Sequence, residues 1–284
     1  MRFILKVTFL FIIIVFAYTL FLKVYPVKAS YYSYLQENQI RAEDFHFGNQ
    51  TYDVIIVGSS MSEGLTLPGL NKRSTTLNFI GGGSLTGLAL IKQKKKLPKA
   101  IILETNWLER PLDENLIRPA LNPLYSSFLN YLPFLQEKNH PINVLTGQVS
   151  STTHAINFKE AMQYVSYNMG RNMEFENKYV DTLQIKESAK KIKKYVDYFE
   201  QHGVKIYMME LPAHPKMWST KRNIETKRFV ELYFRKVSRI PPYPNLNALQ
   251  TYDGNHLVES SREKYSTFLA NFLIKNKNDW DHNL

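Results

Sequence analysis

Two short segments of this chain carry the hydroxyl, imidazole and carboxylate side chains that together can perform acyl transfer. Two adjacent serines, Ser59 and Ser60, follow a run of β-branched residues, and Asp253 and His256 stand three positions apart near the C-terminal end. A serine hydroxyl becomes a nucleophile when an imidazole takes its proton. A carboxylate on the other ring nitrogen fixes the tautomer of that imidazole and stabilises its cation. We therefore expect a serine nucleophile, His256 as the base and Asp253 as the group that orients the base.

Groups able to hold an oxyanion are also present. Gly81–Gly83 supplies backbone N–H groups that a substrate can approach closely, and Asn106 supplies a side-chain amide. Each preorganised donor to a tetrahedral intermediate is worth roughly 3 to 4 kcal/mol of transition-state stabilisation. His214 follows a predicted strand and is a candidate substrate contact, with a structural loop histidine as the alternative. The ordinary alternatives are a helix cap for Ser60 and turn residues for Asn106 and Asp253.

Buried strands that alternate with helices would bring these residues together. Asp53–Val57 is a continuous, mainly β-branched run that ends at Gly58, as in a strand covered on both faces. The predicted strands are Asp53–Val57, Thr75–Phe79, Ala100–Leu103 and Lys205–Leu211, and the predicted helices are Ser84–Lys96, Ile185–Gln201 (closed by Gly203), Ile224–Arg239 and Arg262–Lys275. This alternation predicts an α/β fold with a parallel central sheet between helical layers. The carboxyl ends of the strands then share one edge, where ligands bind.

The domain organisation follows from the same pattern. Residues 30–50 are polar and aromatic and indicate a linker, and residues 51–284 indicate one catalytic domain. Residues 107–182 break the alternation and carry many aromatic side chains, which predicts a partly helical insertion over one end of the sheet. Packing explains these aromatic side chains, with stacking on sugar rings as the alternative.

The N-terminal segment, residues 1–29, is the compartment signal. Its uncharged, largely apolar stretch, Val7–Leu22, has basic residues on both sides. The stretch is long enough for a transmembrane helix if the Lys6 side chain snorkels, so we expect an uncleaved anchor. The alternative is a cleaved signal peptide with a poor small-residue site at Val27–Ala29. Either way, the bulk of the chain is expected to be exported. With the anchor, the expected location is the bacterial cytoplasmic membrane, crossed once, with the catalytic domain on the periplasmic or extracellular side.

Composition excludes several classes of function. The 284-residue chain is 44% hydrophobic and 21% charged, which is typical of a folded domain. It contains no cysteine, so disulfides, thiolate metal sites and a cysteine nucleophile are excluded. The net charge of +11 is compatible with an anionic partner. However, the one dense basic run, Lys92–Lys96, has no aromatic interleaving, and no nucleic-acid-binding module is recognisable. We expect no nucleic acid partner, no metal and no cofactor.

The serine and acid–base segments resemble two sequence blocks of the SGNH (GDSL-like) hydrolase family. Gly58-Ser59-Ser60 is similar to the first block, although serine stands where the family has aspartate. The resemblance assigns the nucleophile to Ser60 and leaves Ser59 as a secondary candidate. Asp253 and His256 match the aspartate-x-x-histidine block completely.

Two further segments resemble the middle blocks of this family. Asn78–Ser84 is similar to the second block, which makes Gly83 an oxyanion donor, with Gly82 as the alternative register. Glu104–Trp107 keeps only the asparagine of the third block, which makes Asn106 the other oxyanion donor. The resemblance covers about residues 52–106 and 185–276, and it implies a flavodoxin-like three-layer α/β sandwich.

The resemblance implies an exported serine hydrolase or acyltransferase. Anchored members of this family often modify cell-surface polysaccharides beside a membrane-bound acyl donor protein. An O-acetyltransferase or O-acetylesterase acting on an envelope or secreted polysaccharide is therefore the main hypothesis, by analogy at the level of the fold. The alternatives are a hydrolase of lipids or small esters, and a non-catalytic glycan-binding or assembly partner in polysaccharide export. Water and a sugar hydroxyl both remain candidate acceptors of the acyl group.

Overall fold

The computed structural model of the chain describes residues 1–25, 33–70, 73–149 and 163–281. It divides into two units. Unit 1 comprises Met1–Gly48 and Asn115–Ala155, and unit 2 comprises Asn49–Glu114 and Ile156–Leu284. The chain therefore leaves unit 2 after the third strand of its sheet, contributes to unit 1 and then returns.

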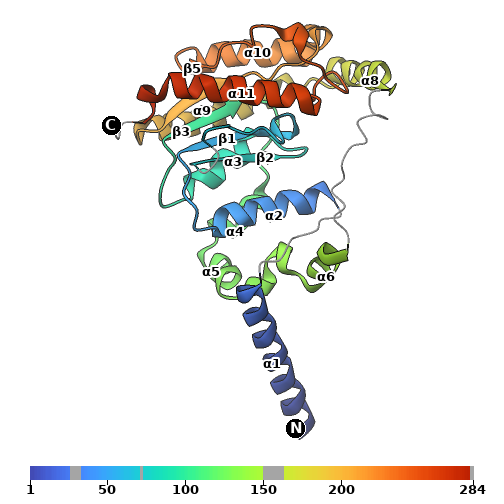
Figure 1. Cartoon of the computed structure of the whole chain (residues 1–284), viewed down its shortest axis with the longest axis vertical. Helices are drawn as coiled ribbons and strands as arrows, with labels where there is room; N and C mark the ends of the chain where they lie inside the picture. The colour runs from blue at the N-terminus through green and yellow to red at the C-terminus, as the bar shows by residue number, and fades with distance from the viewer. Residues whose placement is uncertain (26–32, 71–72, 150–162, 282–284) are drawn as a thin grey trace. The chain divides into compact units, whose positions relative to one another are not determined.

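A five-stranded parallel sheet forms the centre of unit 2 (Figure 1). Its strands are β1 (Val54–Ser59), β2 (Ser74–Phe79), β3 (Ala100–Glu104), β4 (Lys205–Met209) and β5 (Ser238–Arg239). They lie in the order β2-β1-β3-β4-β5, and all neighbours are parallel. This is the strand order of flavodoxin-like doubly wound sheets. The predicted α/β fold with a parallel central sheet is confirmed.

Helices cover both faces of this sheet. Unit 2 contains α3 (Ser84–Lys92), α8 (Val165–Lys178), α9 (Thr182–Gln201), α10 (Lys221–Phe234) and α11 (Glu259–Lys275), with short 3-10 helices η1 (Ser60–Ser62), η5 (Pro215–Ser219), η6 (Leu246–Ala248) and η7 (Lys277–Asp279). On one face, Val54 and Ile56 of β1 belong to the same buried cluster as Leu269 of α11. On the other face, Gly87 of α3 lies so close to Val57 that a Cβ there would be 3.0 Å from a valine methyl. Residues that alternate along β1 therefore pack on opposite helical layers.

The register of the strands gathers several loops at one edge of the sheet. Val57 of β1 pairs with Leu103 of β3, and Ser59 pairs with Phe79 of β2. The segments that follow β1, β2 and β3 therefore leave the sheet side by side. In this strand order the connections reverse direction at β1 and β3, and ligands bind beyond the carboxyl ends of those strands. A ligand site is consequently expected at the loops after β1 and β3.

Two predicted helices were wrong at their C-terminal ends: Ser84–Lys96 ends at Lys92 as α3, and Ile224–Arg239 is wrong over its last five residues. The expected helix Ile224–Arg239 ends at Phe234 as α10, and Ser238–Arg239 forms the edge strand β5 instead. A strand of two residues has no periodicity of its own, so the sequence pattern could not separate it from the helix. The helix Ile185–Gln201 is confirmed within α9, and Gly203 ends it with a φ of +76°.

Unit 1 is built from helices. They are α1 (Arg2–Val24), α2 (Tyr34–Phe47), α4 (Glu114–Leu121), α5 (Pro123–Tyr131) and α6 (Pro141–Val149), with the 3-10 helices η3 (Pro133–Leu135) and η4 (Glu137–Asn139). A buried carboxylate on α2, that of Glu43, accepts a hydrogen bond of 2.7 Å from the backbone N–H of Glu137. The range 30–50, expected as a linker, thus contains a helix that packs inside this unit. The range 107–182, expected as one insertion, is divided between the two units.

The N-terminal helix α1 accounts for the apolar segment of the sequence. It has 23 residues and a mean hydropathy of 2.5, so it is long and apolar enough to cross a membrane. None of its apolar window is buried inside the structure. The candidate cleavage site at Val27–Ala29 lies outside the described residues.

Candidate active site

Ser60, His256 and Asp253 are joined in series by hydrogen bonds. Ser60 is the first residue of η1, directly after β1, and its Oγ lies 2.9 Å from Nε2 of His256. Nδ1 of His256 lies 2.7 Å from Oδ2 of Asp253. The structure therefore brings these three predicted residues together in the order nucleophile, base and orienting acid.

The segment around Asp253 holds itself in shape by local bonds. Oδ1 of Asp253 accepts the backbone N–H groups of Asn255 at 2.9 Å and His256 at 2.8 Å. Gly254, between Asp253 and Asn255, has a φ of +93°, which favours glycine because a side chain would be strained there. The ring of Tyr252 stacks on the imidazole of His256, with centroids 5.4 Å apart. We call residues 252–256 the acid–base loop.

The carboxylate of Asp253 is held in its charged form. Burial by itself would raise the pKa of Asp253. The hydrogen bond from His256, the charge of that imidazolium and two backbone N–H groups outweigh burial, so the pKa falls below its ordinary value. Asp253 is therefore ionised at neutral pH and able to stabilise a protonated His256.

Ser59 has a structural role that separates it from Ser60. Its hydroxyl donates to Oε1 of Glu104 at 2.6 Å, and its backbone N–H donates to Oε2 of the same carboxylate at 2.7 Å. The Oγ of Ser59 also accepts the backbone N–H of Met61 and so caps η1. Ser59 is 2% exposed, which leaves Ser60 as the serine that faces the imidazole.

Glu104, at the end of β3, fixes the turn that carries Ser60. Burial raises the pKa of Glu104, while hydrogen bonds from Ser59 and Ser62 and the charge of His256 act in the opposite direction. A Cβ at Gly58 would lie 2.2 Å from Oε2 of Glu104, so only glycine leaves room for the carboxylate. The glycine of the Gly58-Ser59-Ser60 block is thus explained by this contact.

Gly83 is the N-cap of α3 and lies next to the segment that contains Glu104. The following residue, Ser84, donates through Oγ to the backbone carbonyl of Glu104 at 2.7 Å. The N–H of Gly82 is already bonded to the carbonyl of Phe79. In the part of the chain that the structure describes, the N–H groups of Gly83 and Ser60 donate no hydrogen bond. Gly83 rather than Gly82 therefore has a donor to offer.

The Asn106 side chain has partners other than those expected of an oxyanion donor. Its Nδ2 donates to the carbonyl of Leu211 at 3.0 Å, and its Oδ1 accepts the N–H of Leu211 at 2.7 Å. Asn106 is 5% exposed. This two-way pairing ties the loop after β3 to the loop after β4, which is a structural role.

A buried carboxylate on α8 holds the acid–base loop, and sequence analysis missed it. Oε1 of Glu176 accepts Nδ2 of Asn255 at 2.8 Å and pairs with Arg222 at 2.8 Å. Its Oε2 accepts the hydroxyl of Thr220 at 2.8 Å. One turn earlier on α8, Nδ2 of Asn172 donates to the carbonyl of Asp253 at 3.0 Å. The face of α8 that carries Asn172 and Glu176 therefore positions both ends of the Asp253–Asn255 segment.

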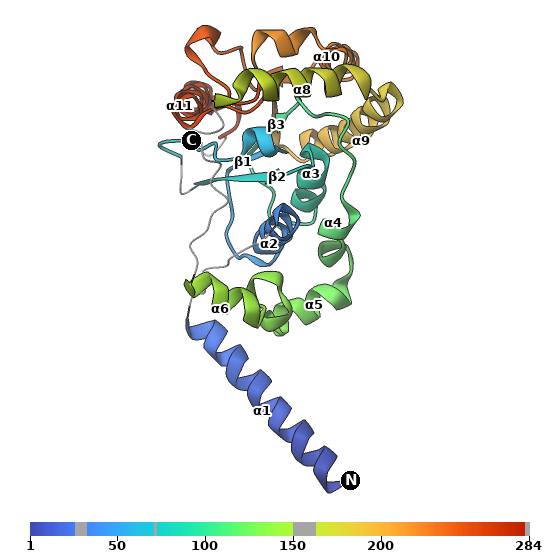
Figure 2. The same ribbon diagram turned by 90° about the vertical axis from the view of Figure 1, so that its right-hand side faces the viewer.

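Arg222 completes this buried network. Its guanidinium lies 3.7 Å from the centroid of the Trp107 ring and donates to the carbonyl of Asn106. Its side chain is 4% exposed and that of Glu176 is 1% exposed. A buried ion pair of this kind is most stable when its remaining polar atoms are bonded. Both oxygens of Glu176 are bonded, whereas Nε of Arg222 has no hydrogen-bond partner among the described residues. Figure 2 shows α8 beside α10, the helix that carries Arg222.

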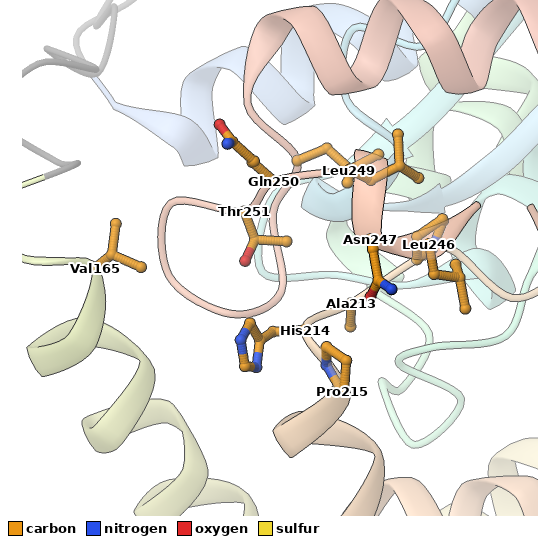
Figure 3. Close-up of a pocket in the computed structure, with 11 residues that line it drawn as sticks. Val165, Ala213, His214, Pro215, Leu246, Asn247, Leu249, Gln250 and Thr251 are labelled. Atoms are coloured by element: carbon orange, nitrogen blue, oxygen red, sulfur yellow. The ribbon is translucent and has the colours of Figure 1, made fainter.

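His214 lines a pocket of about 360 Å³ beside the acid–base loop (Figure 3). The backbone N–H of His214 donates to the carbonyl of Gly254 at 2.8 Å, which joins the pocket wall to that loop. Figure 3 shows Thr251 and Asn247 directed toward the segment that carries His214, whereas Gln250 turns away. The lining residues are Val165, Pro212, Ala213, His214, Pro215, Leu246, Asn247, Leu249, Gln250, Thr251 and Leu257, and none of them is acidic, lysine or arginine.

Comparisons with protein-family models, with curated proteins and with solved structures found no match to this chain. Among the described residues, no group of three or more histidine, aspartate or glutamate side chains is placed to hold a metal ion. The geometry around Ser60 is consequently the basis for inferring a function.

Proposed function

We propose that this protein is an exported serine acyl-ester enzyme of the SGNH type, an O-acetyltransferase or O-acetylesterase that acts on a cell-envelope or secreted polysaccharide. The observation that carries the proposal is the series of hydrogen bonds from Ser60 through His256 to Asp253. The strand order of the sheet supports it as well, because a flavodoxin-like order is what the resemblance to that family implies.

In the first half of the reaction, Oγ of Ser60 forms a bond to the carbonyl carbon of an ester while its proton passes to Nε2 of His256. The ionised Asp253 stabilises the imidazolium that results. The N–H groups of Ser60 and Gly83 donate to the oxyanion, and the N-terminal end of α3 favours negative charge there. The tetrahedral intermediate then releases an alkoxide, which takes the proton from His256 and leaves an acyl group on Ser60.

In the second half, an acceptor hydroxyl attacks the acyl group on Ser60. His256 takes the proton of this hydroxyl and returns it to Oγ of Ser60 as the enzyme is released. Water as the acceptor gives an esterase, and a sugar hydroxyl gives a transferase. The Asn106 amide donates one hydrogen to Leu211, and its second hydrogen remains the expected further donor to the oxyanion.

The pocket beside the acid–base loop is the proposed place for the sugar. Its volume of about 360 Å³ lies in the range of small-molecule sites. Proline and leucine side chains suit the C–H face of a sugar ring, and Thr251, Asn247 and His214 suit its hydroxyl groups. An acyl chain in the same pocket would leave these polar groups without partners, which costs free energy. A neutral sugar therefore fits the lining better than a lipid.

The proposed location is the bacterial cytoplasmic membrane, crossed once by α1, with unit 2 on the periplasmic or extracellular side. The length and hydropathy of α1 support the anchor. A membrane-bound acyl donor protein is the proposed partner if the acceptor is a sugar hydroxyl, because an esterase would need no donor.

The test compares the full-length protein with Ser60→Ala and His256→Ala in a detergent that has no sugar headgroup. We expect the parent to release p-nitrophenol from p-nitrophenyl acetate and to react with a fluorophosphonate probe at Ser60. Both signals should be lost in Ser60→Ala. Ser219→Ala, which removes a hydroxyl from an exposed serine of η5, is the matched control and should keep both.

A folded parent that shows neither turnover nor labelling would contradict the hydrolase. Acetyl transfer that appears only when the membrane-bound donor is added back would then place the protein among the transferases. Binding of a glycan that persists in Ser60→Ala, without any chemistry in the parent, would instead favour a non-catalytic glycan-binding partner.

The proposed sugar site gives a separate prediction. Thr251→Val removes one hydroxyl from the pocket and keeps the shape of the side chain. We expect the KM for an acetylated neutral polysaccharide to rise roughly two- to tenfold, because one hydrogen bond to the sugar is lost, while kcat changes little. Asn245→Ala, outside the pocket and without a side-chain capping bond, is the control. An unchanged KM in Thr251→Val would remove this pocket from the proposal.

A further inference from the structure

A group of large apolar side chains is exposed at the end of α4 and on α5, η3 and α6 of unit 1. The exposed fractions run from 41% for Leu135 to 76% for Tyr131. The members are Leu121, Leu124, Tyr125, Phe128, Tyr131, Leu135, Ile142 and Leu145. Single exposed apolar residues are ordinary, but eight within one short stretch of chain indicate a surface that is covered by something. We call these residues the apolar collar.

The two faces of α5 have opposite character. Leu129 is 1% exposed, and the hydroxyl of Ser126 lies 3.1 Å from Nε2 of His46 on α2, so this side of α5 faces the inside of unit 1. Leu124, Phe128 and Tyr131 are four or three residues apart and lie on one stripe of the helix. That stripe points away from Leu129, because Leu129 directly follows Phe128 and successive residues of a helix are turned by about 100°. The outward face of α5 is thus the more apolar one over these positions.

The C-terminal part of α1 marks the level at which this surface lies. Tyr18 and Phe21 have stacked rings with centroids 6.2 Å apart, and Phe21 and Tyr25 stack at 5.1 Å. Aromatic residues near one end of an apolar helix are typical of the boundary between lipid and water. The hydroxyl of Tyr18 donates to the carbonyl of Asn139 in η4 at 2.7 Å. The segment between α5 and α6 is therefore attached to α1 at its aromatic end.

Helix dimensions place that end at the membrane boundary. With 23 residues, α1 is about 34 Å long, slightly more than the hydrocarbon core of about 30 Å. Tyr18 precedes the last residue of α1, Val24, by about 9 Å along the axis. An interfacial helix buries its apolar face about 5 to 10 Å into the boundary region, which matches this depth.

We propose that α5, η3 and α6 lie in the membrane interface with the apolar collar in contact with lipid. The partner is a bilayer, because the collar is continuous with a helix suited to cross one. Membrane contact by these segments goes beyond anchoring by α1 alone, although it rests on the proposal that α1 crosses the membrane. Unit 1 is then held at the membrane surface by α5, η3 and α6 as well as by α1.

The absence of cysteine from the sequence makes a direct test practical. Single cysteines are introduced at Leu124, Phe128 or Leu145, labelled with an environment-sensitive fluorophore and reconstituted with the full-length protein into phosphatidylcholine vesicles. Lipids brominated near the glycerol end or near the chain terminus quench fluorophores at the matching depth. Asn130→Cys, a polar exposed position on α5 away from the apolar stripe, is the matched control. Ile12→Cys in the middle of α1 reports whether that helix crosses the bilayer.

We expect loss of fluorescence at the three collar positions with shallow bromines, loss at Ile12 with deep bromines, and little loss at Asn130. Quenching at Ile12 without quenching at the collar would overturn the collar proposal and keep the anchor. Collar labels that are shielded from both water-soluble quenchers and bromolipids would overturn it too, because protein would then cover the surface. No quenching at Ile12 would instead refute the anchor on which the proposal rests.

Discussion

Asp253→Asn is expected to lower kcat/KM for an ester substrate by about 10⁴-fold while the protein stays folded. The reason lies in how the two carboxylate oxygens are used. Oδ1 accepts two backbone N–H groups, so an asparagine would keep its oxygen there and turn its NH₂ toward Nδ1 of His256. The imidazole would then carry its proton on Nε2 and donate to Ser60 instead of accepting from it.

The measurement is steady-state hydrolysis of p-nitrophenyl acetate together with thermal unfolding. Asp197→Asn, at a partly exposed position on α9, makes the same chemical change and should leave kcat/KM unaltered. A decrease of less than about tenfold in Asp253→Asn, well below what a misplaced tautomer costs, would mean that another group orients His256.

Glu176→Leu is expected to lower the free energy of unfolding by about 3 to 5 kcal/mol. The leucine removes the carboxylate 2.8 Å from the Arg222 guanidinium, so that its remaining carboxylate is that of Glu109 at 4.0 Å. It also leaves Asn255 without its acceptor. Because Asn255 lies between Asp253 and His256, we also expect slower labelling of Ser60 by a fluorophosphonate. Thermal and denaturant unfolding in detergent, with the labelling rate as a second readout, check both effects.

Two variants sharpen this prediction. Glu174→Leu removes an exposed carboxylate from the same helix and should change the unfolding free energy by less than about 0.5 kcal/mol. Glu176→Leu combined with Arg222→Met replaces the buried charge pair with apolar groups and should recover most of the stability. If the double variant is as unstable as Glu176→Leu, the stability is due to the other contacts of Arg222, such as the carboxylate of Glu109 and the ring of Trp107.

Most of the sheet was predictable because its signal is local. The strands β1, β2, β3 and β4 are short runs rich in apolar or β-branched residues and bounded by glycine, polar residues or proline. Each lies within two residues of its expected bounds. Asp253 and His256 were predictable for the same reason, because a turn of three residues places them together. Ser60 was chosen over Ser59 only by resemblance, and the structure separates the two serines through Glu104.

The supporting network was not predictable because its partners are far apart in the sequence. Glu176 meets Thr220 and Asn255, which are 44 and 79 residues away, and no local pattern marks such pairs. The spacing of Asn172 and Glu176, one helical turn apart, was the one available signal, and it is common on exposed helix faces. The pairing of Asn106 with Leu211 is another long-range contact, over 105 residues, and it gives Asn106 a structural role that no local pattern indicated.

Ser60 and His256 are 196 residues apart in the chain. A ribosome makes Ser60 well before His256, so a nascent chain carries Ser60 without this partner until residue 256 has been made. The hydroxyl of an unassisted serine is a weak nucleophile. Under the proposed mechanism, acyl chemistry begins only when the segment that carries His256 has been made and has docked. Loss of the chain from Tyr252 onward would leave Ser60 in place without His256 and Asp253.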